Sequence, residues 1–164
     1  MGTPPVNRLE QSSESALHLQ IYRQRRDVQA VVHTHSVYAS VVAVTGEELP
    51  PIIDEAVLVV GGSVPISDYA FPGTEELAQK VCHALGQRNA VLIRNHGMVG
   101  VGRSLGQAIE VCLLVERVAQ IFVYSQLLGK TNLLPPEIVA VQQELYYMKK
   151  TVHESEGGQN DNST

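Results

Sequence analysis

Two histidines separated by one residue, His33 and His35, lie in the largely apolar segment 30–36. Side chains alternate between the faces of a β-strand, so both imidazoles would project from one face, about 6–7 Å apart along the backbone. His96 closes a second apolar run, residues 90–94, and a glycine follows it. Three neutral imidazoles with one position left open are the ligand set of a catalytic zinc site. The spacing therefore predicts that these three histidines hold a metal ion.

An alternative for the histidines stays open. A histidine in an apolar strand is commonly a hydrogen-bonded core residue, and His96 alone fits that description, because intermediate burial is normal for imidazole. The His-x-His pair is harder to explain in this way, since two imidazoles side by side in a core need two separate partners. The remaining histidines, His18, His83 and His153, have no partner spacing and are expected to be surface or structural residues.

The composition is that of one globular domain. The chain has 164 residues, of which 44% are hydrophobic and 18% charged, with a formal net charge of -5. Because it is acidic and has no basic run, we expect it to bind neither nucleic acid nor a membrane. No stretch reaches the ~18 apolar residues of a transmembrane helix, and no secretory signal is recognisable. Cys82 and Cys112 match no metal or redox spacing, so we expect buried free thiols and a cytoplasmic location.

The elements that must position the histidines alternate between strands and helices, which predicts a layered α/β domain. Strands are predicted around His33 and His35 and at 56–60, 63–67 and 90–94; helices are predicted at 12–26, 38–44, 75–85, 104–128 and 135–150. The glycine-rich segment 97–102 is predicted to be a tight turn beside a metal ligand. Residues 1–152 are expected to form the domain, and the polar tail 153–164 is expected to be disordered.

Four motifs, read together, resemble the class II aldolase/adducin family and, within it, the enzymes that cleave L-fuculose 1-phosphate. The motifs are Ser12-Ser13-Glu14, His33-Thr34-His35-Ser36, the segment 69–78 and Asn95-His96-Gly97. The resemblance covers roughly residues 10–130. It implies a three-layer α/β/α sandwich with a mostly antiparallel central sheet, a cyclic homotetramer and one Zn²⁺ per subunit.

The resemblance also implies a reaction and roles for individual residues. The reaction is cleavage of a ketose 1-phosphate, such as L-fuculose 1-phosphate, into dihydroxyacetone phosphate and an aldehyde. The roles correspond to three zinc ligands (His33, His35 and His96), a catalytic carboxylate (Glu14) and two serines that help hold the substrate phosphate (Ser12 and Ser13). A carboxylate beside the free N–H groups of a helix start suits a phosphorylated ligand. Alternatively, Glu14 is a solvated first-turn residue that interacts with the helix dipole.

Two departures from the family pattern bear on the substrate. Family members carry a longer segment before the Ser-Ser-Glu motif, with a phosphate-binding loop; this chain has only residues 1–11 there, so half of the phosphate cradle is expected to be missing. By spacing, Asp54 stands where the fuculose-cleaving members have a proton-donating tyrosine, and Tyr69, Tyr146 and Tyr147 are the substitutes that the chain offers.

Other activities of the same family are alternatives. They comprise phosphosugar epimerases, dehydratases and decarboxylases, and non-catalytic adducin-like interaction domains. Family epimerases typically carry aspartate at the position of Glu14 and a long insertion before the last histidine, and adducin-like relatives lose the metal histidines. Neither pattern is present here, which favours the aldolase.

Overall fold

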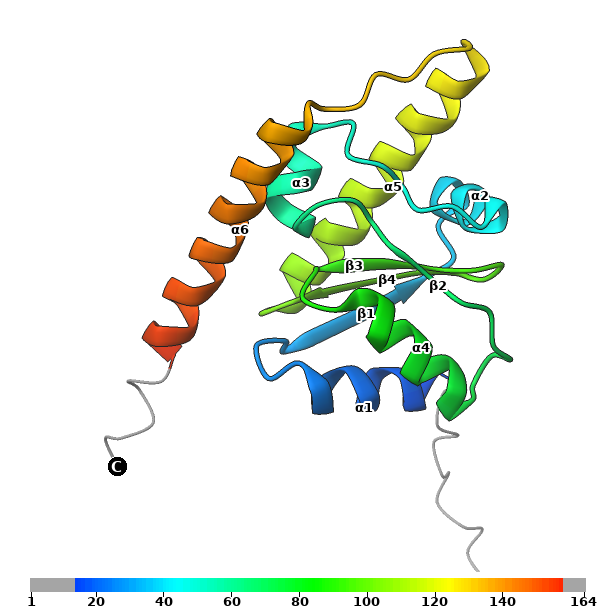
Figure 1. Ribbon diagram of the computed structural model, residues 1–164. Coiled ribbons are helices and arrows are strands. Elements are labelled where there is room, and N and C mark those ends of the chain that lie inside the picture. The colour runs from blue at the N-terminus through cyan, green and yellow to red at the C-terminus, as the bar shows by residue number, and fades with distance from the viewer. Residues whose placement is uncertain (1–13, 158–164) are drawn as a thin grey trace, which may run out of the picture.

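A four-stranded β-sheet lies at the centre of residues 14–157, the part of the chain that the computed structural model describes (Figure 1). Its strands are β1 (Ala30–Thr34), β2 (Ile66–Ser67), β3 (Ala90–Ile93) and β4 (Gly97–Gly102). They lie in the order β1-β4-β3-β2. β4 is antiparallel to both β1 and β3, whereas β2 runs parallel to β3. The sheet is therefore mostly antiparallel, as the family resemblance implies.

Helices cover both faces of this sheet (Figure 1). One face is covered by α1 (Ser15–Gln24) and α4 (Glu75–Leu85), and the other by α2 (Val37–Thr45), α3 (Asp54–Val60) and α5 (Leu105–Leu127). The alternation of strand side chains divides the core accordingly. Val91 and Ile93 pack with α1 and α4, whereas Ala90 and Leu92 pack with the helices of the opposite face. The predicted three-layer α/β/α sandwich is confirmed.

Residues 54–60 form a helix, and the prediction of a strand at 56–60 is wrong. A short apolar run cannot be assigned to a strand or a helix by periodicity alone. Here the flanking residues select the helix: Asp54 and Glu55 occupy its first turn, where acidic side chains interact favourably with the helix dipole. Gly61, at φ 97°, ends it in the left-handed conformation and donates its N–H to a carbonyl one turn earlier.

Residues 97–102 form β4, and the prediction of a turn there is also wrong. The glycines of this strand serve close packing rather than chain reversal. A Cβ at Gly100 would lie 2.6 Å from the Cys112 sulfur, and one at Gly102 would lie 2.8 Å from the Ala108 nitrogen. Both partners belong to α5, so these glycines allow the long helix to lie directly against the strand.

Helix α6 (Pro136–Gly157) lies at the periphery, beside α3 (Figure 1). It continues past Lys150, where the sequence predicts its end, while residues 158–164 of the predicted disordered tail lie outside the described part. Across residues 14–157, no helix combines the length and the apolar composition needed to cross a membrane.

Two helix starts and both cysteines match the predictions. Thr74 accepts a hydrogen bond from the N–H of Leu77 at the start of α4, as an N-cap residue should. Ser104 caps α5 in the same way. Cys82 and Cys112 are buried free thiols, and burial raises the pKa of each to about 11.

Candidate metal centre

The pairing of β4 with both β1 and β3 brings the three histidines to one end of the sheet. His33 lies on β1, His35 follows directly after β1, and His96 lies in the short loop that joins β3 to β4. Because β1 and β3 both pair with the start of β4, the end of β1 meets this loop. Asn95 adopts a left-handed conformation (φ 57°), which asparagine tolerates better than most residues, and so allows the tight reversal before His96.

Gly97 allows the loop to approach β1 closely. A Cβ at this position would lie 2.4 Å from the Thr34 carbonyl oxygen and 3.0 Å from Cδ2 of His35. The first contact is with backbone, which cannot rotate away as a side chain can. Only glycine therefore lets the β3–β4 loop place His96 beside the β1 histidines.

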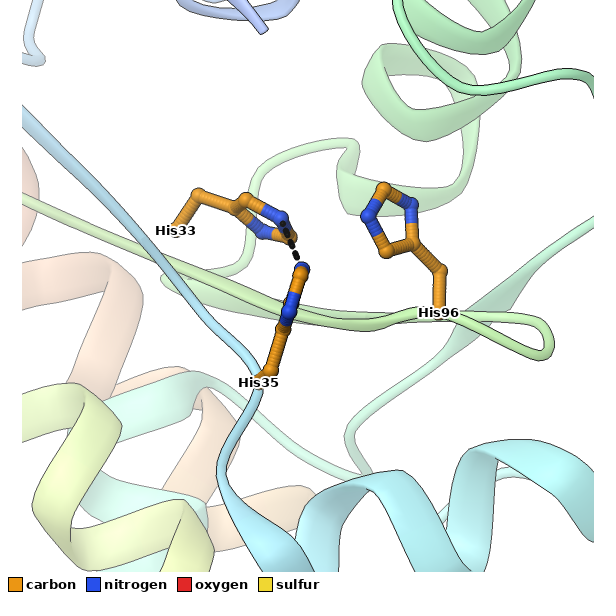
Figure 2. Close-up of side chains that lie close together, drawn as sticks. All are labelled: His33, His35 and His96. Carbon is orange, nitrogen blue, oxygen red and sulfur yellow. Dashed lines mark hydrogen bonds between the residues drawn. The ribbon is translucent and has the colours of Figure 1, made fainter.

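The three imidazoles converge on one point (Figure 2). Each pair of ring centroids is 4.9 Å apart, and one ring nitrogen from each histidine lies within 4.8 Å of the others. Nε2 of His33 and Nε2 of His35 are 3.1 Å apart. Two nitrogens at the Zn–N distance on a tetrahedral ion are separated by about 3.3 Å. The donor set and its spacing thus fit a zinc ion.

The hydrogen bonding of His33 fixes which nitrogen is available as a ligand. Its Nδ1 lies 2.9 Å from the carbonyl oxygen of Met98. A carbonyl only accepts, so Nδ1 carries the proton, and in the neutral ring Nε2 presents a lone pair to the centre of the cluster. Metal-binding histidines are commonly oriented in this way, by an N–H donated to a backbone carbonyl. The bond depends on the β1–β4 register, in which Met98 is the partner of Thr34.

Burial keeps two of the rings neutral. It lowers the pKa of His33, and the neighbouring imidazoles of His96 and His35 lower it further, against the raising effects of the Met98 bond and the Glu14 charge. Burial likewise lowers the pKa of His96. Nδ1 of His96 is buried without a hydrogen-bond partner among the described residues, and unpaired buried polar atoms are uncommon outside functional sites. Neutral imidazoles are the form that binds metal.

Glu14 lies beside this cluster. Side-chain alternation puts His33 on the same sheet face as Val31, which packs with α1, and Glu14 immediately precedes α1. The carboxylate is close enough to raise the pKa of both His33 and His96 through its charge. The structure thus brings Glu14 to the histidines. Ser12 and Ser13, the predicted phosphate-binding residues, lie outside the described residues.

Glu116 is a residue of this region that no sequence pattern indicates. Its two carboxylate oxygens accept hydrogen bonds from the backbone N–H groups of Tyr38 (3.0 Å) and Ala39 (2.8 Å), in the first turn of α2. The local cap is missing because the hydroxyl of Ser36 lies 2.8 Å from that of Thr34. Glu116, on α5, therefore holds the start of α2, only a few residues after His35.

Two of the residues considered as proton donors, Asp54 and Tyr146, have other contacts. Asp54 accepts a hydrogen bond from Nε2 of Gln142 on α6 (2.5 Å). The hydroxyl of Tyr146 lies 2.8 Å from the Gln87 carbonyl. Gln87 lies just before β3, at the opposite end of that strand from His96. Burial raises the pKa of the Tyr146 hydroxyl. Tyr69 and Tyr147 are exposed. The contacts of Asp54 and Tyr146 place neither residue beside the histidines of the same chain.

Comparisons with known proteins agree with the geometry. The family model described as "Class II Aldolase and Adducin N-terminal domain" matches residues 2–123. A 5-deoxy-D-ribulose 1-phosphate aldolase of Bacillus thuringiensis serovar kurstaki is 36% identical over 126 residues, which are 77% of this chain and 59% of that protein. The L-fuculose phosphate aldolase of Escherichia coli K12 is 35% identical over 111 residues, which are 68% of this chain and 52% of that protein.

A solved structure leads to the same family. An L-fuculose 1-phosphate aldolase superposes with a TM-score of 0.78 at 34% sequence identity, over 83% of this chain and 64% of that one. This chain thus spans between half and two thirds of the length of the relatives it matches. The matched residues include the whole histidine cluster and Glu14. The chain belongs to the class II aldolase/adducin family.

Proposed function

We propose that this protein is a zinc-dependent aldolase that cleaves a ketose 1-phosphate into dihydroxyacetone phosphate and an aldehyde. The observation that carries the proposal is the cluster of His33, His35 and His96, with the His33 tautomer held by the Met98 carbonyl. Three imidazoles with one coordination position left open are the pattern of a catalytic rather than a structural zinc site. Membership of an aldolase family supports the same reaction.

The names of the relatives indicate a narrower substrate class. One is named for 5-deoxy-D-ribulose 1-phosphate and others for L-fuculose phosphate. Both sugars are ketoses that end in a methyl group, and both give dihydroxyacetone phosphate from their phosphorylated half. The substrate inferred for this chain is accordingly a terminally deoxygenated ketose 1-phosphate, whose aldehyde product ends in a methyl group.

Each site residue has a role in this reaction. Zinc, when bound by the three histidines, supplies Lewis acidity towards the hydroxyl and ketone oxygens of the substrate. Glu14 delivers a proton to the carbon of dihydroxyacetone phosphate that was bonded to the aldehyde half, and removes it in the reverse direction. Ser12 and Ser13 contact the phosphate, together with N–H groups at the start of α1. The protein is inferred to act in the cytoplasm as a homotetramer.

Metal analysis and product trapping test this function. The purified chain is expected to contain about one zinc per subunit, as a single three-histidine site requires. It is then assayed with L-fuculose 1-phosphate and 5-deoxyribulose 1-phosphate, while dihydroxyacetone phosphate is reduced by a coupled NADH-dependent dehydrogenase. Turnover without dihydroxyacetone phosphate would favour an epimerase, dehydratase or decarboxylase. Zinc well below one equivalent would favour a non-catalytic interaction domain.

A further inference from the structure

One face of α6 carries apolar side chains at the spacing of a coiled coil. Ile138, Val141, Leu145 and Met148 follow one another at intervals of three, four and three residues, and each is between 42% and 64% exposed. Val152 continues the spacing. Alternating intervals of three and four place side chains at positions a and d of a heptad, where two helices meet. Below, Ile138, Val141, Leu145 and Met148 are called the α6 seam.

The seam points away from the rest of the chain. The side of α6 that contacts the body carries Tyr146, which is 5% exposed, and Gln143, whose side-chain amide donates to the Gly61 carbonyl (3.1 Å). With 3.6 residues per turn, Gln143 lies opposite the middle of the seam, and Tyr146 lies about a third of a turn away from it. A second helix can therefore lie along the seam while α6 keeps its contacts with the body.

Charged residues beside the seam indicate what covers it. When the seam residues occupy positions a and d, Glu144 occupies position g and Lys149 position e, and both are exposed. In two parallel helices in register, a g residue lies opposite the e residue five positions later in the partner, so Glu144 would meet Lys149 of the partner subunit. Antiparallel helices pair g with g and e with e, and would bring together Glu137, Glu144 and Thr151, which offer no opposite charges.

We propose that the α6 seam binds the same seam of a second copy of this chain, as a parallel, in-register two-stranded coiled coil. Each a and d side chain then meets its own equivalent, and the bodies of the two copies lie on the outer sides of the helix pair. An isolated helix of this length is marginal in water, but α6 is already held by its contacts with the body, so association does not have to form it. The seam is only about 15 Å long, which predicts a weak, concentration-dependent contact that adds to the inferred tetramer rather than replacing it.

Cysteine cross-linking in the full chain tests the pairing directly. In a parallel, in-register pair, the thiols introduced by Leu145→Cys in the two copies face each other, and so do those introduced by Met148→Cys. With oxidised glutathione, both variants are expected to form disulfide-linked dimers. Tyr147→Cys is the matched control, because its exposed position lies between them in sequence but off the seam. The native Cys82 and Cys112 are buried, so they add little background. Equal cross-linking of Leu145→Cys and Tyr147→Cys would overturn the proposal.

Two further measurements test the orientation. The first uses a mixture of tagged Ile138→Cys chains and untagged Met148→Cys chains. Parallel pairing gives disulfide-linked dimers of two tagged or two untagged chains. Predominantly mixed dimers would show antiparallel pairing and overturn the register. Glu144→Lys is expected to reduce cross-linking of Leu145→Cys several-fold, because two lysines then face each other. Adding Lys149→Glu to the same chain should restore it, since opposite charges meet again. A reduction that is not restored, with unchanged circular dichroism, would also contradict the parallel pairing.

Discussion

The histidine centre and helix α6 are held in place in different ways. At the histidine centre the backbone sets the geometry, because strand pairing fixes the register and Gly97 lies against the Thr34 carbonyl. Helix α6 is attached largely through side chains, among them the Tyr146 hydroxyl, the Gln143 amide and the Lys150 ammonium. Side-chain bonds can be lost one at a time, whereas a strand register shifts only as a whole. Substitutions in the first region should therefore change metal binding and chemistry, and those in the second should change stability and assembly.

The largest difference between the regions is expected for two glutamates at helix starts. Glu14→Gln keeps the size and hydrogen-bonding reach of the side chain beside the histidines but removes its basicity. Turnover of the ketose phosphate should fall by roughly 10²–10⁴-fold while zinc stays bound, the usual effect of losing a positioned acid–base group. Glu137→Gln makes the same chemical change in the first turn of α6 and should leave turnover unchanged. A Glu14→Gln protein with near-normal turnover would reduce Glu14 to a helix-dipole residue.

Substitution of the metal ligands is expected to have the next largest effect. Replacing His33, His35 or His96 by alanine should lower zinc affinity by at least ~10-fold, because losses of 10- to 100-fold follow even when only a ligand's hydrogen-bond partner is removed. The control is His83→Ala in the last turn of α4, a histidine outside the cluster. Competition titration with a chromophoric chelator measures the affinity. Any one of the three variants that binds zinc as tightly as the wild type would remove that histidine from the site.

Two glycines in close contacts extend the comparison: Gly97 lies against backbone, whereas Gly61 lies against a side chain and has a positive φ (97°). A Cβ at Gly97 meets the Thr34 carbonyl oxygen at 2.4 Å, and a Cβ at Gly61 meets the Tyr146 ring at 2.6 Å. Alanine at either position should lower the free energy of unfolding by roughly 1–3 kcal/mol, the usual cost of overpacking. Only Gly97→Ala should also weaken zinc binding, by about tenfold, because it moves the His96 loop away from β1. Chemical denaturation combined with zinc titration of both variants measures the two effects. Equal zinc affinities would show that the loop can adjust.

The features of this molecule that the sequence predicts well are those determined by residues close to one another in the chain. The alternation of strand side chains predicted that His33 and His35 lie on one face, and the predicted helix at 75–85 matches α4. The errors arose where distant residues decide. The glycines of 97–102 suggest a turn until α5 is known to pack on them. The Met98 carbonyl orients His33 only through the β1–β4 register.

The contact of Glu116 with α2 is the clearest example of one that no local pattern predicts. Its substitution is expected to change stability and zinc binding less than the substitutions above. Glu116→Gln removes the charge that binds the first turn of α2 from α5, and should cost about 1 kcal/mol of stability, as loss of an N-cap does. Thr74→Ala, which removes the cap of α4, is the matched control. Only Glu116→Gln should also weaken zinc binding, by a few-fold, because the chain from His35 enters α2 there. Equal zinc affinity in the two variants would limit Glu116 to a structural role.

The smallest effect is expected at Lys150, which attaches α6 through an ion pair with Asp27 (3.1 Å). Burial raises the pKa of the Asp27 carboxyl, but the hydrogen bonds and charges of Arg25 and Lys150 outweigh it and hold this pKa well below its ordinary 3.8. A carboxylate with a depressed pKa contributes stability above its unfolded pKa and loses that contribution as the pH falls through the folded value.

Lys150→Gln should therefore cost about 1 kcal/mol or less at pH 7, since the pair is partly solvated. The difference between the variant and the wild type should shrink only as the pH falls through the folded-state pKa of Asp27 in the variant, which Arg25 still holds below 3.8. Protonation of Asp27 in the unfolded state is common to both proteins and cancels. Urea denaturation of both proteins at pH 7 and near pH 2 measures it. A difference that stays constant between the two pH values would mean that Lys150 stabilises α6 through its bonds to Gln87, at 2.8 and 3.1 Å, rather than through the ion pair. Zinc affinity should be unchanged in the variant, because Lys150 and the other described side chains of α6 contribute no ligand to the histidine cluster.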